Sequence, residues 1–552
     1  MQAQTRIIAR ATGQEGAVKM VAVGEEKAEH VQKCAWESVG AVPNVPFAQY
    51  MMEKMADAGD KVALVDGVSG ETLKFSEIID WMKRVSFGWH EAGLEAGHVV
   101  CLVTPNCVQA PAAFLAAIAA SAVVTLSNPL YTPDELKRHF TDSKSKWIVV
   151  HPLCLPGVQA AIKDLDEIKG VYVLGSSAVN GVEPLVGLSQ DQPESWQYHG
   201  VSGDSVVHLP YSSGTTGLPK GVELTSSNWL AVLSTIGRKE YLDVSSDDTG
   251  LGILPIFHAF GMAMYLTALS HGMTMVTLPR FIPDVFLKAI QTYKVTLAPL
   301  VPPLALFMAK HDLVTKFDLT SITNIICGAA SLSGDVQALL SKRLSGVRVR
   351  QGYGLTETTL ATFSSETDLP GAVGTVTAHC EAKIVDMKTG DSVGPGIDGE
   401  ICIRGPLIMK GYLNNEEATA NIIDNAGWLH TGDIGHYDEN GIFFIVDRIK
   451  ELVKYKGFQV APAELEGLLV TNENVADAAV VGIKDEEAGE LPKAFVVPKP
   501  GKTINPDELV NWVHDRVAPH KRLRGGVEVI ESVPRSPAGK ILRRKLREQA
   551  NA

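Results

Sequence analysis

The stretch YSSGTTGLPKGV at residues 211–222 has the composition of a phosphate-binding loop. Glycine lets a backbone turn its N–H groups toward an anion, hydroxyl side chains add donors, and lysine adds a positive charge. Gly221 follows Lys220, where the common nucleotide-binding formula has serine or threonine. A flexible surface loop is the plainer interpretation, and the density of glycine and hydroxyl positions disfavours it. The candidate phosphate-binding residues are Ser212, Ser213, Gly214, Thr215, Thr216 and Lys220.

A second stretch, QGYGLTETT at residues 351–359, carries an aromatic ring and a carboxylate. Tyr353 offers a flat ring on which a purine can stack, and the glycines on either side allow close backbone approach. Glu357 supplies an oxygen ligand of the kind that Mg²⁺ prefers. A Thr–Glu pair alone is more typical of a helix N-terminus, so this interpretation depends on the phosphate-binding loop in the same chain.

Three further side chains could take part in the same chemistry. Asp433 lies in GWLHTGDIG, where a carboxylate can accept hydrogen bonds from the vicinal hydroxyls of a ribose, although an Asx-turn is the plainer alternative. His258 lies among apolar residues in LPIFHAFGM, where a histidine is more often part of the core. Lys540 belongs to a basic C-terminal segment that forms either a solvated helical face or a positive wall for a polyanionic substrate.

Taken together, these stretches resemble the AMP-forming, adenylate-making superfamily of acyl-CoA synthetases, peptide-synthetase adenylation domains and beetle luciferases. The resemblance extends from about residue 40 to the end of the chain. It is strongest toward the branch of 4-coumarate–CoA ligases and acyl-CoA ligases, which NPLYTPDELKRHF and KVTLAPLVPP reinforce. The stretches that carry it are YSSGTTGLPKGV at 211–222, QGYGLTETT at 351–359, GWLHTGDIG at 427–435, DRIKELVKYKGFQVAPAELE at 447–466 and PRSPAGKILRRKL at 534–546.

The resemblance implies a role for each candidate residue. Lys540 would reach into the site during adenylation and neutralise charge between the acyl carboxylate and the α-phosphate, which is an electrostatic and positioning task. The other implied contacts are Gln351 and Gly352 with adenine, Thr356 with the adenylate phosphate, Glu357 with Mg²⁺, Asp433 and Arg448 with the ribose, and His258 with the region of the acyl carboxylate and the thiol path.

The segment after residue 446 resembles the mobile C-terminal domain of this family. Asp447 corresponds to a hinge, where a few backbone angles absorb a large domain motion. Lys450 and Lys454 are four residues apart and share a face if this piece is helical. After rotation the segment would replace the Lys540 loop for thioester formation, and the implied coenzyme A contacts are Lys456 and Gly457, with Gln459 beside them.

Apolar residues replace polar ones at the acyl end. Where 4-coumarate–CoA ligases usually have a tyrosine and a lysine, this chain has Phe260 and Ile326. A phenolic hydroxyl left unpaired there costs roughly 1–3 kcal/mol, whereas each buried CH₂ of an apolar chain contributes about 0.8 kcal/mol. We therefore expect a medium- or long-chain fatty acid, or a cinnamate-like acid without a 4-hydroxyl. The predicted lining is Phe260, Met262, Met264, Ile326 and Ala329.

Strand-like runs such as VVCLVTP and KWIVVHP alternate with helical patterns such as PDVFLKAIQTYK, which predicts α/β layers with largely parallel sheets. APAAFLAAIAASAVVTL at 110–126 is expected to be a buried helix running into a strand. From about residue 390, short strands separated by Gly and Pro predict a small β-rich subdomain. The expected division is an N-terminal extension of unknown role over 1–40, an adenylate-forming domain of layered α/β subdomains over 41–446, and a small mobile α+β domain over 447–552.

Composition narrows the class of partner. A chain of 552 residues with 45% hydrophobic and 20% charged residues is typical of a multidomain globular protein. Its net charge of −13 argues against nucleic acid as a partner, and no membrane span is expected. Seven cysteines without a Cys-x-x-Cys motif fit a reducing compartment. The expected location is the cytoplasm, since the chain lacks a Ser-Lys-Leu ending and its first residues resemble a transit peptide only weakly.

The sequence thus predicts an ATP-dependent acid–CoA ligase that uses ATP, Mg²⁺ and coenzyme A. It would form acyl-AMP and then acyl-CoA from an apolar acid, either 4-coumarate- or cinnamate-like or a medium- or long-chain fatty acid. Three alternatives stay open: a luciferase-type oxygenase, an adenylation enzyme that loads a carrier protein, and a non-enzymatic nucleotide-binding protein.

Overall fold

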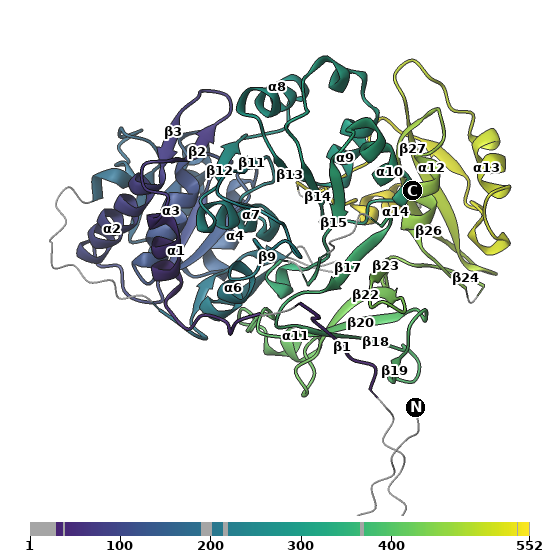
Figure 1. Ribbon diagram of the computed structural model, residues 1–552, viewed down its shortest axis with the longest axis horizontal. Coiled ribbons are helices and arrows are strands. Elements are labelled where there is room, and N and C mark those ends of the chain that lie inside the picture. Colours follow the sequence, from purple (N-terminus) through teal and green to yellow (C-terminus); the bar gives the residue numbers. More distant parts are fainter. Residues whose placement is uncertain are drawn as a thin grey trace, which may run out of the picture.

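The computed structural model describes residues 29–36, 39–188, 201–212, 219–360, 362–364, 369–456, 458–537 and 539–550. It confirms the predicted mixed α/β class, with a large N-terminal domain and a small C-terminal domain. In Figure 1 the small domain, drawn in yellow and yellow-green, packs against one end of the large one.

The first sheet of the large domain has a parallel centre, in which β5, β4, β6 and β7 are neighbours. Every residue of β4 is buried, as expected of a parallel strand covered on both faces. Its strands in spatial order are β21 (Gly411–Tyr412), β10 (Lys220–Thr225), β8 (Val206–His208), β5 (Val123–Ser127), β4 (Val99–Val103), β6 (Ser145–Val150) and β7 (Gly170–Val173), with β9 (Tyr211–Ser212) paired to β10.

The second sheet is parallel except at its last pair, β2 and β3. The carboxyl ends of β14 and β15 lead directly into the stretches around residues 328–332 and 351–359. Its strands in spatial order are β15 (Arg348–Gln351), β14 (Asn324–Cys327), β13 (Leu297–Leu300), β11 (Thr249–Gly252), β12 (Thr274–Thr277), β2 (Val62–Asp66) and β3 (Thr72–Lys74).

Helices cover both sheets and also fill the space between them. Helix α3 contacts β4 and β5 of the first sheet, α7 contacts β11 and β12 of the second, and the two helices contact each other. Alternate residues of β4 accordingly enter different cores, Val100 and Leu102 on one face and Cys101 and Val103 on the other. The helices of this domain are α1 (Phe47–Ala56), α2 (Phe75–Glu91), α3 (Gln109–Ala119), α4 (Pro133–Asp142), α5 (Leu155–Ile162), α6 (Ser226–Leu233), α7 (Ala259–Ser270), α8 (Pro283–Tyr293), α9 (Pro302–Lys310), α10 (Gly334–Arg343) and α11 (Glu416–Ala420).

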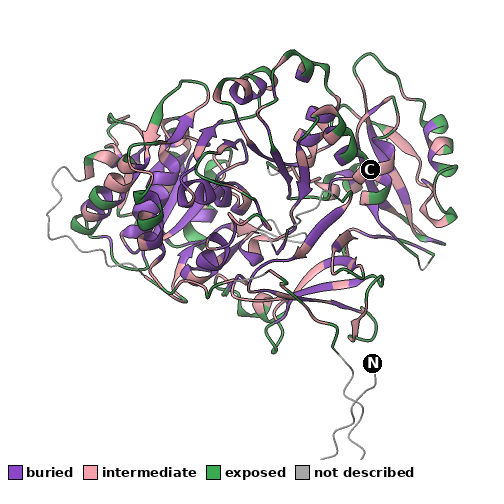
Figure 2. Ribbon diagram, viewed as in Figure 1, coloured by how far each residue is buried: buried purple, intermediate pink, exposed green. Residues whose placement is uncertain are grey.

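The alanine-rich stretch that was predicted to be a buried helix is buried. Residues 110–119 of α3 are all buried, and the helix runs into β5, which confirms that expectation. Figure 2 shows the buried residues concentrated in this part of the large domain. Within the part of the chain that the structure describes, no helix combines the length and the apolar composition needed to cross a membrane.

The β-rich part is larger than predicted. It is an antiparallel sheet whose strands begin well before residue 390, because residues 363–385 already contribute three of them. It also takes in Gln32–Lys33, from the segment set aside as an N-terminal extension, which pair with β18. Its strands are β1 (Gln32–Lys33), β18 (Glu381–Val385), β20 (Gly399–Arg404), β22 (Leu429–Tyr437), β23 (Phe443–Arg448), β17 (Ala372–Val376) and β16 (Phe363–Ser364), with β19 (Ser392–Val393) paired to β18.

The small domain begins where the chain leaves β23 after Arg448 and enters a separate sheet at Val453. The predicted helix followed by two strands is present as α12, β26 and β27, and Asn505 caps α13 by accepting from Asp507 N at 3.1 Å. Its elements are β24 (Val453–Tyr455), β25 (Phe458–Val460), α12 (Pro462–Leu469), β26 (Val475–Asp485), β27 (Gly489–Pro498), α13 (Pro506–His514), β28 (Val527–Val529) and α14 (Arg543–Ala550).

Many cations of the basic C-terminal segment form ion pairs. Acidic side chains of the same domain pair with many of its cations, so fewer are left for a positive wall facing a polyanion, and that interpretation stays a prediction. The pairs are Arg535–Asp477, Arg543–Glu466, Arg547–Glu451, Lys521–Glu464 and Arg544–Glu548.

Candidate active site

Two adjoining cavities lie where the large and small domains meet. We call the first the inner cavity: it has a volume of about 550 Å³ and extends from Lys540 to His258 and Phe260. We call the second the interdomain cavity: it has a volume of about 700 Å³ and lies between α10 and α12. Arg448, Lys540 and residues 352–355 line both, so the two cavities form one site.

One end of the inner cavity gathers a lysine and a carboxylate. The Lys220 ammonium lies 4.8 Å from the centroid of the Tyr412 ring, and the Tyr412 hydroxyl donates to Glu357 Oε1 at 2.8 Å. Ser212 and Thr356 line the same cavity. A fixed cation beside a carboxylate is the arrangement that a metal-bound polyphosphate requires. The remaining predicted loop residues, Ser213, Gly214, Thr215 and Thr216, lie outside the described residues.

The strand that leads into this loop is tied down at Tyr211. Its hydroxyl donates to Asp142 Oδ2 at 2.5 Å, and its ring lies 4.3 Å from that of His139, centroid to centroid. The His139 Nε2 atom is 3.0 Å from Thr125 Oγ1. Burial lowers the pKa of His139 to about 4, so this imidazole is neutral near pH 7. The start of the loop is therefore fixed against α4 and β5.

Tyr353, Asp433 and Arg448 form a connected group between the two cavities. The Tyr353 hydroxyl donates to Asp433 Oδ2 at 2.7 Å, and Arg448 Nε lies 3.0 Å from Asp433 Oδ1. One side of the Tyr353 ring packs on Phe363, with centroids 5.4 Å apart and an interplanar angle of 23°. Burial raises the pKa of Asp433, and the Arg448 guanidinium opposes that rise.

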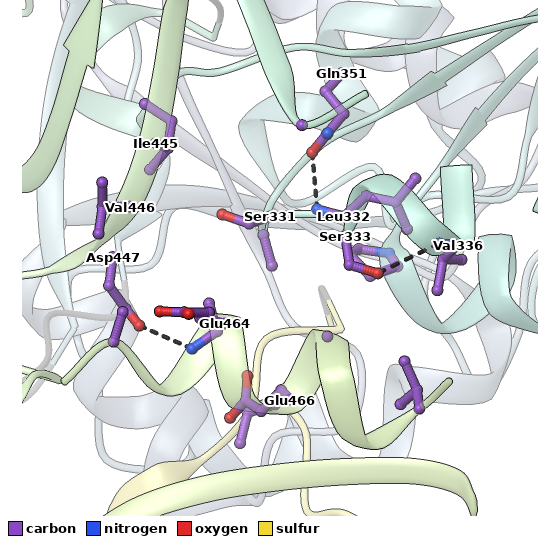
Figure 3. A pocket seen from close by; sticks show the side chains of 18 of the residues that line it. Ser331, Leu332, Ser333, Val336, Gln351, Ile445, Val446, Asp447, Glu464 and Glu466 are labelled. Atoms are coloured by element: carbon purple, nitrogen blue, oxygen red, sulfur yellow. Dashed lines mark hydrogen bonds between the residues drawn. The ribbon is translucent and has the colours of Figure 1, made fainter. Parts of the chain in front are cut away.

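Gln351 shapes the interdomain cavity by holding a neighbouring loop. Its side-chain oxygen accepts from Leu332 N at 2.8 Å, as Figure 3 shows, and its Nε2 donates to Gln337 Oε1 at 3.3 Å. The same loop contains Ala329, whose φ of 68° is in the left-handed region that residues with a Cβ rarely adopt. Ala329 and Gly352 line both cavities, so this loop and β15 supply a shared wall.

The far end of the inner cavity is mostly apolar. Phe260, Met264, Ile326 and Ala329 line it as predicted, together with Ile236, Tyr241 and Leu242, which sequence reasoning did not single out. Met262, which was also predicted to line the pocket, is fully buried and packs in the helical core instead. The cause is helical geometry, since Met262 and Met264 are two residues apart on α7 and point to different sides.

His258 stands at the boundary between the apolar end and the rest of the cavity. It precedes α7 and lines the inner cavity. Its Nε2 atom is buried and has no hydrogen-bond partner among the described residues. Burial lowers the pKa of His258 to about 4, so the ring is neutral and can offer a hydrogen bond without bringing a charge.

Lys540 of the small domain lines both cavities. It lies in a short hairpin whose Gly539 approaches the large domain so closely that an added Cβ would be 3.1 Å from Val301 Cγ2. Burial lowers the pKa of Lys540 to about 8, and the neighbouring Arg448 acts in the same direction. The lysine is thus held at the site in a mainly protonated form near neutral pH.

The other predicted residues of the small domain are divided between the site and the surface. Lys450 lines the inner cavity, whereas Lys454, Lys456 and Gln459 are exposed and line neither cavity. The conditional expectation that Lys450 and Lys454 share a helical face is wrong, because Lys450 is in a turn and Lys454 is in β24. Gly457 lies outside the described residues.

Sequence reasoning also missed a hydrogen-bonded group beside Asp433. Glu400 Oε2 lies 2.9 Å from His430 Nδ1, and Glu400 Oε1 accepts from Gly432 N at 3.0 Å. Cys402 Sγ is 3.5 Å from the same histidine nitrogen. Glu400 therefore fixes the turn that carries Asp433. His430 belongs to the stretch GWLHTGDIG, which was a signal for it, whereas Glu400 comes from the neighbouring strand β20.

Glu357 fits the metal ligand that the fold implies. Its carboxylate lines the inner cavity, is held by the Tyr412 hydroxyl, and lies at the end that Lys220 makes positive. Hard divalent cations such as Mg²⁺ bind through one or two carboxylates together with substrate phosphates, so a single fixed carboxylate is sufficient.

The fold and these side chains define an enzyme that handles a nucleotide and a carboxylic acid in one site. The chain matches the AMP-binding enzyme family over residues 52–413 and the AMP-binding enzyme C-terminal domain over residues 464–540. It therefore belongs to the AMP-binding enzymes, the superfamily that forms acyl-adenylates.

Relatives and solved structures agree with this placement. The chain is 40% identical over 523 residues to 4-coumarate-CoA ligase 1 of Narcissus pseudonarcissus, which covers 92% of this chain and 94% of that one. It is 37% identical over 546 residues to a 4-coumarate–CoA ligase of Pinus taeda, covering 96% and 100%. ATP-bound MatB from Rhodopseudomonas palustris is a similar structure, with a TM-score of 0.81, 28% identity and coverage of 90% and 98%.

Proposed function

We propose that this protein is an ATP-dependent acid–CoA ligase that forms acyl-AMP and then acyl-CoA from an apolar carboxylic acid. One observation carries the proposal: Lys540 of the small domain reaches the same site as Lys220, Glu357 and Asp433 of the large domain. The inner cavity of that site, about 550 Å³ in volume, has an apolar end that suits an acyl chain or an aromatic acid.

Each residue has a task in the first half-reaction, in which the acyl carboxylate attacks the α-phosphorus of ATP and pyrophosphate leaves. Tyr353 stacks on the adenine, and Asp433, held by Tyr353 and Arg448, accepts from the ribose hydroxyls. Lys220 and the loop before it hold the departing phosphates. Glu357 would hold Mg²⁺, which neutralises phosphate charge when bound.

Lys540 acts where the two anions approach each other. A carboxylate and a phosphate repel, and an ammonium between them removes that repulsion and fixes their geometry. Neutral His258 offers a hydrogen bond at the acyl carboxylate without competing for that charge. The apolar end of the cavity then excludes water from the mixed anhydride.

The second half-reaction requires the small domain to turn about Asp447. In the arrangement seen here, Lys454, Lys456 and Gln459 face solvent while Lys540 occupies the site. A rotation that withdraws Lys540 would bring this exposed hairpin toward the acyl-AMP, and with it the coenzyme A thiol that attacks the carbonyl and releases AMP.

A panel of acids assayed for pyrophosphate release, with and without coenzyme A, tests the proposal. We expect release that depends on an apolar acid and a CoA thioester only when coenzyme A is present. Thioester transfer to a carrier protein but not to coenzyme A, light emission with a luciferin, or nucleotide binding without turnover would each point to one of the alternatives and contradict the ligase.

The same panel of acids shows which acyl group the enzyme prefers. Phe260 and Ile326 offer no hydrogen bond to a 4-hydroxyl, so we expect kcat/KM for cinnamate or a fatty acid to exceed that for 4-coumarate. A much higher kcat/KM for 4-coumarate than for every other acid would contradict this selectivity and leave the reaction class intact. A cytoplasmic location is part of the proposal, supported by seven free thiols.

A further inference from the structure

Two arginine–carboxylate pairs flank the hairpin that carries Lys540. We propose that Arg535–Asp477 and Arg543–Glu466 are positioning pairs for the adenylation half-reaction, which act by holding Lys540 at the site. This inference rests on the proposed function, because it concerns how the lysine of that reaction is placed.

The hairpin is closed by its own backbone. Arg535 and Ile541 form an isolated β-bridge, and Leu542 N donates to Pro534 O at 2.8 Å. Lys540 makes its hydrogen bonds to Ser536, whose N donates to Lys540 O at 2.8 Å and whose Oγ accepts from Lys540 N at 3.2 Å. The position of the Lys540 side chain therefore follows from the position of this hairpin.

Arg535 ties the tip of the hairpin to the sheet. Its Nη2 donates to both carboxylate oxygens of Asp477, at 2.8 and 3.1 Å, and its Nη1 donates to Gly539 O at 2.9 Å. Asp477 is in β26 and also accepts from Ala478 N at 2.9 Å. One guanidinium thus joins the residue next to Lys540 to the longest strand of the small domain.

Arg543 ties the other end of the hairpin to the same strand through α12. Its Nη2 donates to both oxygens of Glu466, at 2.8 and 2.9 Å. Glu466 Oε1 also accepts from Val480 N in β26 at 2.8 Å. The side chains of Arg543 and Glu466 are only 11% and 14% exposed, so solvent screens this pair little.

These contacts matter to catalysis because a lysine that must sit between two reacting groups tolerates little displacement. A misplacement of about 1 Å can cost about 100-fold in rate. The hairpin contacts the large domain at Gly539 near Val301, so a loosened hairpin would lose that contact as well. In the proposed reaction, thioester formation takes place after Lys540 has been withdrawn from the site, so it does not depend on the contact between the hairpin and the large domain.

The test compares the two half-reactions in Arg535→Gln and Asp477→Asn. We expect the rate of acyl-AMP formation, measured by pyrophosphate release, to fall about 10- to 100-fold. The rate of thioester formation from supplied acyl-AMP should stay within about twofold of wild type. Arg535→Lys keeps one charged contact and should be intermediate. Arg543→Gln leaves Glu466 buried without its partner. This variant is therefore compared in the two half-reactions once its melting curve shows a folded protein.

Arg544→Gln is the matched control, because it removes the same side chain type one residue beyond Arg543. Arg544 and its partner Glu548 are 83% and 65% exposed, and we expect both half-reactions to be unchanged. Equal losses in the two half-reactions of Arg535→Gln and Asp477→Asn, or no loss in either, would overturn the positioning role. Wild type that forms no acyl-AMP with any acid would instead overturn the proposed function.

Discussion

The charge on Lys540 is the property of this residue on which its role depends. A buried ammonium is costly, and the pKa of about 8 reflects that cost. The value stays above neutral pH because Glu451 and Asp433 act against burial and against the positive charge of Arg448. Lys540 is therefore mostly protonated in the free enzyme near neutral pH and can bind a pair of anions.

Removal of that charge should separate the two half-reactions. We expect Lys540→Ala to lower acyl-AMP formation by about 100-fold or more, as for removal of a preorganised charge-stabilising group. Thioester formation from supplied acyl-AMP should be retained. Quenched-flow measurement of each half-reaction checks this, and an equal loss of both would contradict the assigned division of labour.

The pH dependence of the first half-reaction should report the same ammonium. The protonated form is the active one, so kcat/KM for acyl-AMP formation should fall as the pH rises through about 8, where the side chain loses its proton. Arginine stays charged, so Lys540→Arg should be slower overall but should lack this alkaline limb. A limb that persists unchanged in Lys540→Arg would assign it to another group.

Sequence reasoning found the site residues that stand in locally unusual stretches and missed those that reach the site through strand pairing. Lys220 and Glu357 are prominent in glycine- and hydroxyl-rich runs. Tyr412 is not, and it meets them only because β21 pairs with β10. Asp142 reaches Tyr211 across sixty-nine residues of chain from the end of helix α4, a tertiary contact that no single window of sequence contains.

At the scale of elements, the strand before the phosphate-binding loop has to be fixed if the loop is to hold phosphate. Tyr211 provides the connection, through the hydrogen bond to Asp142 on α4 and through the ring contact with His139. The hydroxyl contributes a net hydrogen bond worth about 0.5–1.5 kcal/mol.

Loss of that hydroxyl should therefore weaken nucleotide binding more than chemistry. We expect Tyr211→Phe to raise KM for ATP about 2- to 10-fold, the ratio that such a hydrogen bond corresponds to. Steady-state kinetics at saturating acid measures this. Tyr172→Phe is a suitable control, since Tyr172 lies in β7 of the same sheet, stacks on Trp147 and lines neither cavity. An unchanged KM for ATP in Tyr211→Phe would show that the strand needs no such anchor.

The segment after Arg448 illustrates why element boundaries were harder to predict than element types. The repeat of Lys450 and Lys454 is compatible with a helix, but Val453–Tyr455 pairs with both β25 and β27 and so forms a strand. The long-range partner decides the conformation, and a single window of sequence does not contain it. The strand β4 and the helix α3 were predictable because an element that is buried on all sides has apolar residues along nearly its whole length.

At the scale of the whole molecule, the interdomain cavity is the space across which the small domain faces the large one. Figure 3 shows Ser333 at the start of α10 on one side of it and Glu466 of α12 on the other. One close approach is at Gly467, where an added Cβ would lie 2.9 Å from the Ser333 Cβ. A Cβ at position 467 therefore requires a small opening of this interface.

That approach allows the proposed domain rotation to be tested by a reversible cross-link. The Cβ atoms of a disulfide are usually about 3.5–4.5 Å apart, so Ser333→Cys with Gly467→Cys can be bridged after a small opening of the interface. The oxidised double variant should form acyl-AMP and retain it on the enzyme, while thioester formation falls at least about 10-fold because the hairpin at Lys456 cannot replace Lys540. Reduction should restore thioester formation, and each single variant, treated with the same oxidant, should be unaffected by it. Undiminished acyl-CoA synthesis by the cross-linked enzyme would show that both half-reactions use the arrangement seen here.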